Sequence, residues 1–229
     1  MSSLGIIVAR SGSKRLPGKN LKLLAGMPLI AYSVRAAVES QLDRTIISTD
    51  SSEIAEVAAH YGAEVLFLRP SALAQDDTSS YEVVKHAVEW LKQHENFSDE
   101  IILLLQPTTP FVLPKDINAC LAILENDQIV NSCFTLRELE KPPAWLVEMD
   151  QKGFIHFEEK KDALYYPSGA VYAMRIAALE AQQKISCIPA RGVLMERERS
   201  IDIDTETDFL LAEILAERFH FPQCAFSRE

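Results

Sequence analysis

Apolar and polar positions along the first half of the chain follow two alternating periods. Continuous apolar runs, rich in β-branched residues, predict buried strands at 4–9, 44–49, 63–68 and 100–106. Between them, apolar residues that recur at helical spacing predict helices at about 30–38, 52–62 and 79–94. Strands that alternate with helices are typical of right-handed βαβ units, so we expect an α/β fold with a mostly parallel sheet and helices on both faces.

The second half of the chain is less regular. A helix is predicted at 114–126 and a strand-like segment at 129–138, and the pattern then breaks at about 137–166, where prolines, aromatics and an apparent hairpin around 150–153 occur. We interpret this stretch as an excursion from the sheet. The remaining predicted elements are a strand at 170–174, a short helix, a strand at 184–190 and a helix from about Glu206.

Composition indicates an ordinary soluble globular protein, with 48% hydrophobic and 24% charged residues in 229. No apolar run approaches the roughly 18 residues that cross a bilayer, and the N-terminal residues lack the pattern of a secretory signal. We therefore expect a cytoplasmic protein that does not bind membranes. A net charge of -10 also argues against general nucleic-acid binding. The cysteines are far apart and are expected to be buried, reduced thiols: Cys120, Cys133, Cys187 and Cys224.

The segment 9–20, "ARSGSKRLPGKN", concentrates positive charge directly after the first predicted strand. Its cationic residues are Arg10, Lys14, Arg15 and Lys19. Ligands of open α/β sheets bind at the carboxyl ends of the strands, and glycines such as Gly12 and Gly18 allow the backbone to approach an anion closely. The loop therefore predicts a site for a triphosphate, with a solvated surface loop as the alternative.

Two common phosphate-binding motifs fit this loop poorly. A P-loop requires four residues between its glycines followed by Lys-Ser or Lys-Thr, whereas five residues separate Gly12 from Gly18 and Asn20 follows Lys19. The G-x-G-x-x-G dinucleotide motif is also absent. A metal-binding hydroxyl is thus missing from the loop, and a metal must be held elsewhere.

Four ordered segments together resemble one enzyme family, the acylneuraminate cytidylyltransferases or CMP-sialic acid synthetases. They are "ARSGSKRLPGKN" at 9–20, "STD" at 48–50, "LLQPTTPF" at 104–111 and "SIDIDTETDF" at 200–209. The resemblance implies a three-layer αβα nucleotidyltransferase fold, Rossmann-like, over residues 1–229. It also implies transfer of CMP from CTP to a nine-carbon 2-keto sugar acid (a nonulosonic acid) with release of pyrophosphate, and a homodimer formed partly through the inserted segment at about 137–166.

The resemblance also implies roles for particular residues. Those of the nucleotide loop are Arg10, Gly12, Ser13, Lys14, Lys19 and Asn20. Ser80 resembles a further cytidine contact, Gln106 a sugar-binding glutamine and Tyr172 a sugar-facing aromatic. Asp202 and Asp204 resemble the aspartates that hold Mg²⁺, and with Arg10 and Lys19 they form the expected catalytic group.

Elementary chemistry supports the two aspartates independently. In an extended segment, side chains two positions apart point to the same face, and two carboxylates that close favour a cation between them. Magnesium commonly uses one or two carboxylates together with substrate phosphates. The alternative is that Asp204 or Thr205 caps the last helix, with Asp208 completing a capping box. Asp50, Ser51 and Ser52 are similarly candidates to cap the helix at 52–62, and for Asp50 we favour the cap over catalysis.

Other features depart from the family pattern or leave alternatives open. Ser168-Gly169 stands where these enzymes commonly have Asn-Gly, and the basic residue for the sugar carboxylate is a choice among Lys141, Lys160 and Lys161. The aromatics Phe157, Tyr165 and Tyr166 are expected in packing or at a dimer interface. Alternatives are a cytidylyltransferase for the eight-carbon acid Kdo, a non-catalytic nucleotide sensor, and an aspartyl phosphohydrolase. The last is disfavoured because too little chain follows "IDIDT".

Overall fold

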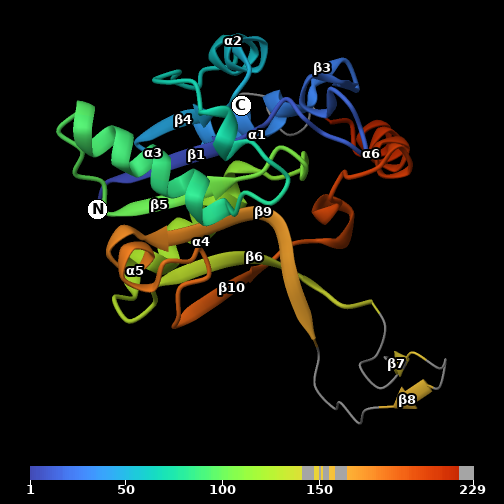
Figure 1. Ribbon diagram of the computed structural model, residues 1–229. Coiled ribbons are helices and arrows are strands. Elements are labelled where there is room, and N and C mark those ends of the chain that lie inside the picture. The colour runs from blue at the N-terminus through green and yellow to red at the C-terminus, as the bar shows by residue number, and fades with distance from the viewer. Residues whose placement is uncertain (141–146, 150, 152–154, 158–163, 222–229) are drawn as a thin grey trace.

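The computed structural model describes residues 1–140, 147–149, 151, 155–157 and 164–221 and contains a six-stranded sheet (Figure 1). The strand order is β10-β6-β9-β5-β1-β4. The strands are β1 (Ser3–Val8), β4 (Arg44–Ser48), β5 (Ile101–Leu105), β6 (Ser132–Glu138), β9 (Tyr165–Arg175) and β10 (Ala190–Leu194). Only β9 runs antiparallel to its neighbours within this sheet, so the expected mostly parallel sheet is confirmed.

Helices cover both faces of this sheet and make the molecule three layers thick (Figure 1). One face packs against α1 (Leu29–Val38), α2 (Ser52–His60), α4 (Pro114–Asn126) and α6 (Glu206–Arg218). The opposite face packs against α3 (Ser80–His94) and α5 (Ile176–Gln182). Strand β5 explains why both faces are covered: Leu103 and Leu105 lie in one core cluster, Ile102 and Leu104 in the other.

Short elements complete the described part of the chain. They are the 3₁₀ turns η1 (Lys19–Leu21), η2 (Ser71–Leu73) and η4 (Arg197–Ser200), and the strands β2 (Leu23–Leu24), β3 (Met27–Pro28), β7 (Val147–Met149) and β8 (Ile155–Phe157). β7 and β8 pair with each other as an antiparallel hairpin apart from the main sheet (Figure 1), which confirms the predicted hairpin.

Two of the predicted strands are wrong. Segment 63–68 lies beside the edge strand β4 and makes only a single parallel bridge to it, through Glu64. Val65 and Leu68 are 42% and 54% exposed. Segment 184–190 is irregular, and β10 begins at Ala190. The preceding residue is Pro189, which has no N–H to donate to a ladder. Within the segment Cys187 is buried, whereas Ile188 is 63% exposed.

Two expectations based on composition can also be compared with the fold. Cys120, Cys133 and Cys187 are buried free thiols, as expected, and Cys224 lies outside the described residues. Among the described helices, none combines the length and the apolar character that spanning a membrane requires.

Candidate functional site

A cavity of about 610 Å³ opens where β1 and β5 end. The residues after β1, the residues after β5, the start of α3 and the segment before α6 form its walls. The lining includes these residues expected from the sequence: Arg10, Ser13, Lys14, Lys19, Asn20, Ser80, Gln106, Asp202 and Asp204. Gly12 and Tyr172, also expected at the site, are not part of the lining. Segments from distant parts of the chain thus converge at the carboxyl edge of the sheet.

The basic loop is held in place by its own surroundings. Ser11 donates to Asp50 through its amide (2.9 Å) and its hydroxyl (2.6 Å). Asn20 donates from its side chain to the carbonyl of Arg10 at 3.0 Å, and Arg69 donates to the carbonyl of Ala9 at 3.2 Å. These contacts fix the path of the backbone on either side of the cationic residues.

The expectation that Asp50 caps the following helix is wrong. Ser51 is the N-cap of α2, since its side chain accepts from the amide of Ile54, whereas Asp50 holds Ser11. Burial alone would raise the pKa of Asp50, but the two hydrogen bonds from Ser11 and the nearby charge of Arg69 outweigh it, so the net pKa is lowered. Asp50 is therefore an ionised anchor for the basic loop.

Each cation of the loop meets a carboxylate. Arg10 pairs with Asp76 at 2.7 Å, and Lys14 pairs with the same side chain. Arg15 and Lys19 each lie 3.2 Å from Asp204. Lys19 differs from the others because its side chain is only 10% exposed, and its Nζ also donates to the carbonyl of Ile203 at 2.7 Å. A polyanion entering the cavity would compete with these carboxylates for the same positive charges.

Several lining residues were not singled out from the sequence. Segment 69–78 contributes Arg69, Leu73, Gln75, Asp76 and Thr78. Arg69 is 5% exposed, and its Nε is buried without a hydrogen-bond partner among the described residues. Burial lowers the pKa of Arg69, opposed by the charge of Asp50. The sequence did carry a signal for it: a charged residue directly after the apolar run "AEVLFL" at 63–68.

The two candidate metal ligands lie in the segment before α6, where Asp204 contacts Arg15 and Lys19 of the basic loop. Ile201 and Ile203 are buried, so the intervening Asp202 and the following Asp204 face the cavity, as the spacing predicted. The helix cap belongs to other residues: Thr205 accepts from the amide of Asp208 in a capping box that Asp208 completes. The capping alternative is therefore wrong for Asp204 and correct for Thr205.

The electrostatics of Asp202 suit a cation. Its carboxyl lines the cavity, where it is partly shielded from water, and this desolvation raises its pKa. A hydrogen bond with Thr108 opposes the rise, and the negative charge of Asp204 adds to it. Among the described residues, no group of three or more His, Cys, Asp or Glu side chains could hold a metal ion. Two carboxylates that face one cavity could hold a divalent cation, with phosphate oxygens and water as its remaining ligands.

Gln106 also lines the cavity, and Gly169 lies directly beside it without being part of the lining. Gly169 has φ +89°, and a Cβ built there would lie 3.1 Å from Oγ1 of Thr109, 3.4 Å from Oε1 of Gln106 and 3.9 Å from Oδ2 of Asp202. Close approach to the site and a left-handed backbone both require glycine at this position. The preceding Ser168 is buried and donates to Thr135 Oγ1 at 2.8 Å, so its side chain supports the strand.

The aromatic candidates lie beside or outside the cavity. Tyr172 packs against Phe134 with ring centroids 5.5 Å apart, and burial, followed by the charge of Asp202, raises the pKa of its phenol. Tyr165 and Tyr166 are exposed, and Arg137 lies 5.6 Å from the ring centroid of Tyr166. The side chain of Phe157 is outside the described residues, as are Lys141, Lys160 and Lys161.

Comparisons with known proteins agree on one family. A family model described as "Cytidylyltransferase" matches residues 4–218. A CMP-N,N'-diacetyllegionaminic acid synthase from Legionella pneumophila is 35% identical, over 95% of this chain and 97% of the relative. An N-acylneuraminate cytidylyltransferase from Escherichia coli is 30% identical, over 94% of this chain but only 52% of the relative, so this chain spans about half of that protein.

A solved structure supports the same fold. The structure of CMP:2-keto-3-deoxy-manno-octonic acid synthetase complexed with CTP superposes with a TM-score of 0.71 at 18% sequence identity, covering 96% of this chain and 100% of the other. At that identity the likeness concerns the fold, which is the nucleotidyltransferase fold expected from the sequence. The match of the family model over residues 4–218 and the full-length relative at 35% identity together show that this chain belongs to the cytidylyltransferase family.

Proposed function

We propose that this protein transfers CMP from CTP to a nine-carbon 2-keto sugar acid of the nonulosonic type, giving the CMP-sugar and pyrophosphate. One observation carries the proposal: the same cavity is lined by the cationic residues Arg10, Lys14 and Lys19 and by the carboxylates Asp202 and Asp204. The two sequence relatives are named for a legionaminic and an acylneuraminic acid, which supports the class of sugar.

The chain's own residues would do three things in this reaction. Arg10, Lys14 and Lys19 would bind the triphosphate and neutralise the pyrophosphate as it leaves, which is the main electrostatic demand of the step. Ser13, Asn20 and Ser80 would orient the nucleotide, so that the sugar hydroxyl attacks the α-phosphorus in line with the leaving oxygen. As the new P–O bond forms, the hydroxyl's proton would pass to solvent water, and the departing pyrophosphate would keep the electron pair of the broken P–O bond.

Asp202 and Asp204 would hold Mg²⁺. Their carboxylates are the oxygen ligands that magnesium prefers, and they face the same cavity as the phosphate-binding cations. When bound, the ion would act as a Lewis acid toward a phosphoryl oxygen. Arg15 and Lys19, which pair with Asp204, would then turn toward the phosphates.

The sugar acid would lie at Gln106, next to Gly169. Gln106 offers a neutral donor and acceptor at the end of β5, which suits hydroxyl recognition. The eight-carbon Kdo acid is the second candidate, because the CTP-complexed relative in fold is named for that sugar.

The quaternary state and compartment are part of the proposal. We infer a homodimer that uses the inserted segment at about 137–166, and a cytoplasmic enzyme. Sedimentation velocity of the full chain should give about twice the mass of the 25.6 kDa chain, and a monomer at micromolar concentration would contradict the dimer.

The direct test is pyrophosphate release from CTP with a panel of sialic, legionaminic, pseudaminic and Kdo acids. We expect turnover with at least one nine-carbon acid and a lower kcat/KM with Kdo. A preference for Kdo would transfer the assignment to the eight-carbon class. Binding of CTP with no turnover across the panel would identify a nucleotide sensor instead.

Asp202→Ala tests the metal assignment. We expect turnover to be abolished with the fold intact, as judged by circular dichroism and melting temperature. Asp77→Ala is the matched control, since Asp77 is an exposed carboxylate near the cavity that does not line it, and its turnover should equal that of the wild type. Near-normal activity of Asp202→Ala would remove Asp202 from the metal site.

A further inference from the structure

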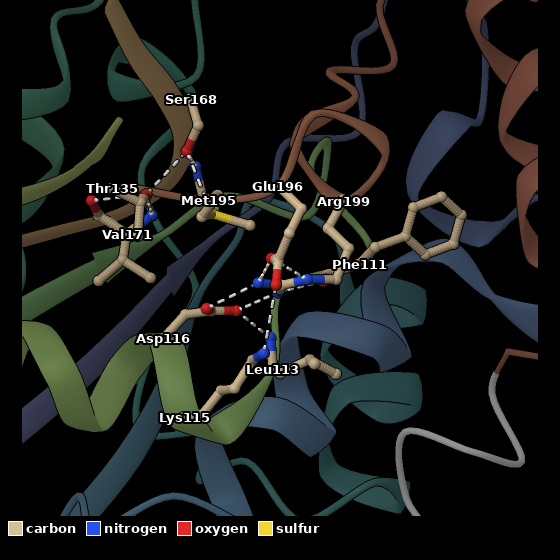
Figure 2. A network of polar contacts seen from close by, with 11 residues as sticks. Phe111, Leu113, Lys115, Asp116, Thr135, Ser168, Val171, Met195, Glu196 and Arg199 are labelled. Atoms are coloured by element: carbon tan, nitrogen blue, oxygen red, sulfur yellow. Dashed lines mark hydrogen bonds and ion pairs between the residues drawn. The ribbon is translucent and has the colours of Figure 1, made fainter. Parts of the chain in front are cut away.

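A buried ion pair joins two segments that reach the cavity from different parts of the chain. Arg199, in η4, and Asp116, in the first turn of α4, have side chains only 12% and 5% exposed. Two guanidinium nitrogens meet two carboxylate oxygens: Nη2 donates to Oδ1 at 3.1 Å, and Nη1 pairs with Oδ2 (Figure 2). This bidentate geometry is specific to arginine among the cationic side chains.

Each partner is tied to further groups. Asp116 accepts from the amide of Leu113, the N-cap residue of α4, at 2.9 Å. Arg199 also donates from Nη1 to the carbonyl of Phe111 at 3.3 Å and pairs with Glu196, which lies 3.5 Å from Lys115 (Figure 2). The guanidinium therefore connects η4 to both the loop after β5 and the start of α4.

Both segments that the Arg199–Asp116 pair joins continue into residues that line the cavity. On one side, the loop after β5 (residues 106–111) carries Gln106 and Thr108, which line the cavity. On the other, Arg199 stands three residues before Asp202. A second tie exists closer to the site, where the amide of Ile203 donates to the carbonyl of Thr108 at 2.8 Å. Two attachments fix the segment 199–204 against the loop in both position and direction.

Net stabilisation alone is a poor explanation for such a pair. Buried ion pairs often contribute little compared with apolar residues of similar size, because both ions lose their hydration. A bidentate pair does restrict geometry, however, since the two planar groups must lie edge to edge in nearly one plane to form two parallel N–H···O bonds. Here the restricted segment is the one that carries both carboxylates.

We propose that Arg199 and Asp116 are positioning residues, which hold the Asp202–Asp204 segment in the orientation that binds the metal–nucleotide complex. The proposal rests on the proposed function for the role of that complex. Neither residue lines the cavity, so both act through Asp202 and Asp204. Partners that orient metal ligands from outside the coordination sphere have this kind of influence in other metal sites.

The test compares Arg199→Lys with a matched control, Arg175→Lys. Arg175 is also partly buried and also donates to backbone carbonyls, of Val130 at 3.0 Å and Asp127 at 3.2 Å, but at the opposite end of β9 from the site. Both variants keep the charge and lose the guanidinium fork. Melting temperature, kcat, KM for CTP, and Mn²⁺ binding in the presence of CTP by electron paramagnetic resonance are measured for the full-length protein.

We expect Arg199→Lys to weaken Mn²⁺ binding and lower kcat by ~10–100-fold, the range typical of such outer partners, with a smaller change in KM for CTP. Arg175→Lys should lose a similar amount of thermal stability with Mn²⁺ binding and kcat unchanged. Equal effects of the two variants on Mn²⁺ binding would reduce Arg199 to a structural residue and overturn the proposal.

Two further variants distinguish loss of the ion pair from misfolding. Asp116→Asn keeps the shape of the side chain and should reproduce the Mn²⁺ defect of Arg199→Lys, whereas Asp116→Leu combined with Arg199→Met removes both buried charges and should fold but bind Mn²⁺ weakly. If the wild-type protein releases no pyrophosphate with any sugar, the proposed function fails, and the Mn²⁺ titration with CTP still decides the positioning role. Wild-type Mn²⁺ affinity in the double variant would contradict it.

Discussion

Gly169 shows how one residue combines a backbone requirement with the shape of the site. Because its φ is +89° and an added Cβ would lie 3.1 Å from Thr109 Oγ1, Gly169→Ala should lower the free energy of unfolding by ~1–2 kcal/mol or more from the left-handed backbone. The methyl group would also push toward Gln106 and Asp202, so kcat/KM for the sugar should fall. Denaturant unfolding and steady-state kinetics measure the two effects.

Gly26→Ala is the control that separates the effect of backbone strain from the effect of a methyl group near the site. Gly26 also has a positive φ, +84°, but its Cβ would meet no atom within 4 Å, and it does not line the cavity. It should share the loss of stability and keep normal kinetics. If Gly169→Ala were as active as Gly26→Ala, the wall around Gln106 would not contact the sugar.

Asp50 gives a prediction about pH. Its carboxyl has a lowered pKa in the folded protein, so the hydrogen bonds from Ser11 contribute stability above the unfolded-state pKa of about 3.9 and lose that contribution as pH falls below it. The difference in unfolding free energy between wild type and Asp50→Asn should be constant near neutral pH and should shrink on acidification below about pH 4. A difference that stays constant into that range would mean that the charge on Asp50 contributes nothing.

The residues that the sequence could and could not predict differ in kind. Arg10, Lys14 and Lys19 lie within one ten-residue loop and Asp202 and Asp204 are two positions apart, so local spacing predicted an anion site and a pair of carboxylates on one face. The family resemblance was needed to predict that both belong to the same cavity. Asp76 was missed because its importance comes from pairing with Arg10, which lies in a separate segment of the chain. Such contacts depend on tertiary packing, which no local pattern encodes.

At the level of elements, helices were predicted better than strands. The helix at 114–126 was predicted with its observed bounds, because Pro114 marks its start and its apolar face is regular. The strands at 63–68 and 184–190 were wrong because a short apolar run shows neither whether its residues are buried nor which strand could pair with it. Whether an extended run becomes a strand depends on a neighbour with free backbone groups.

The start of α3 provides a test at the level of elements, because its two adjacent serines have different roles. Ser79 is the N-cap and forms a capping box with Glu82, whereas Ser80 lines the cavity. Ser79→Ala should cost ~1 kcal/mol of stability. Ser80→Ala should leave stability within about 0.5 kcal/mol and raise KM for CTP. Chemical unfolding and CTP saturation curves distinguish them, and the reverse pattern would remove Ser80 from the nucleotide site.

For the whole molecule, the central contrast is between a net charge of -10 and a cationic cavity. Carboxylates far from the cavity repel CTP weakly, because salt screens charges that are more than about 10 Å apart at 0.1 M ionic strength. Cations within the cavity attract it at short range, and two of them, Lys14 and Arg15, are 84% and 71% exposed and thus also open to screening. The local attraction should therefore dominate the salt dependence.

KM for CTP is accordingly expected to rise as KCl is increased from about 0.05 to 0.5 M at constant free Mg²⁺, over which the Debye length falls toward a few ångströms. Lys14→Gln should raise KM at low salt and flatten this dependence, because one screened cation is gone. Lys85→Gln is the control, since Lys85 is exposed on α3, pairs with Glu89 and does not line the cavity. A KM that falls with added salt would mean that repulsion from the acidic body outweighs the basic loop, and the loop would then bind CTP through backbone and hydroxyl groups more than through its charge.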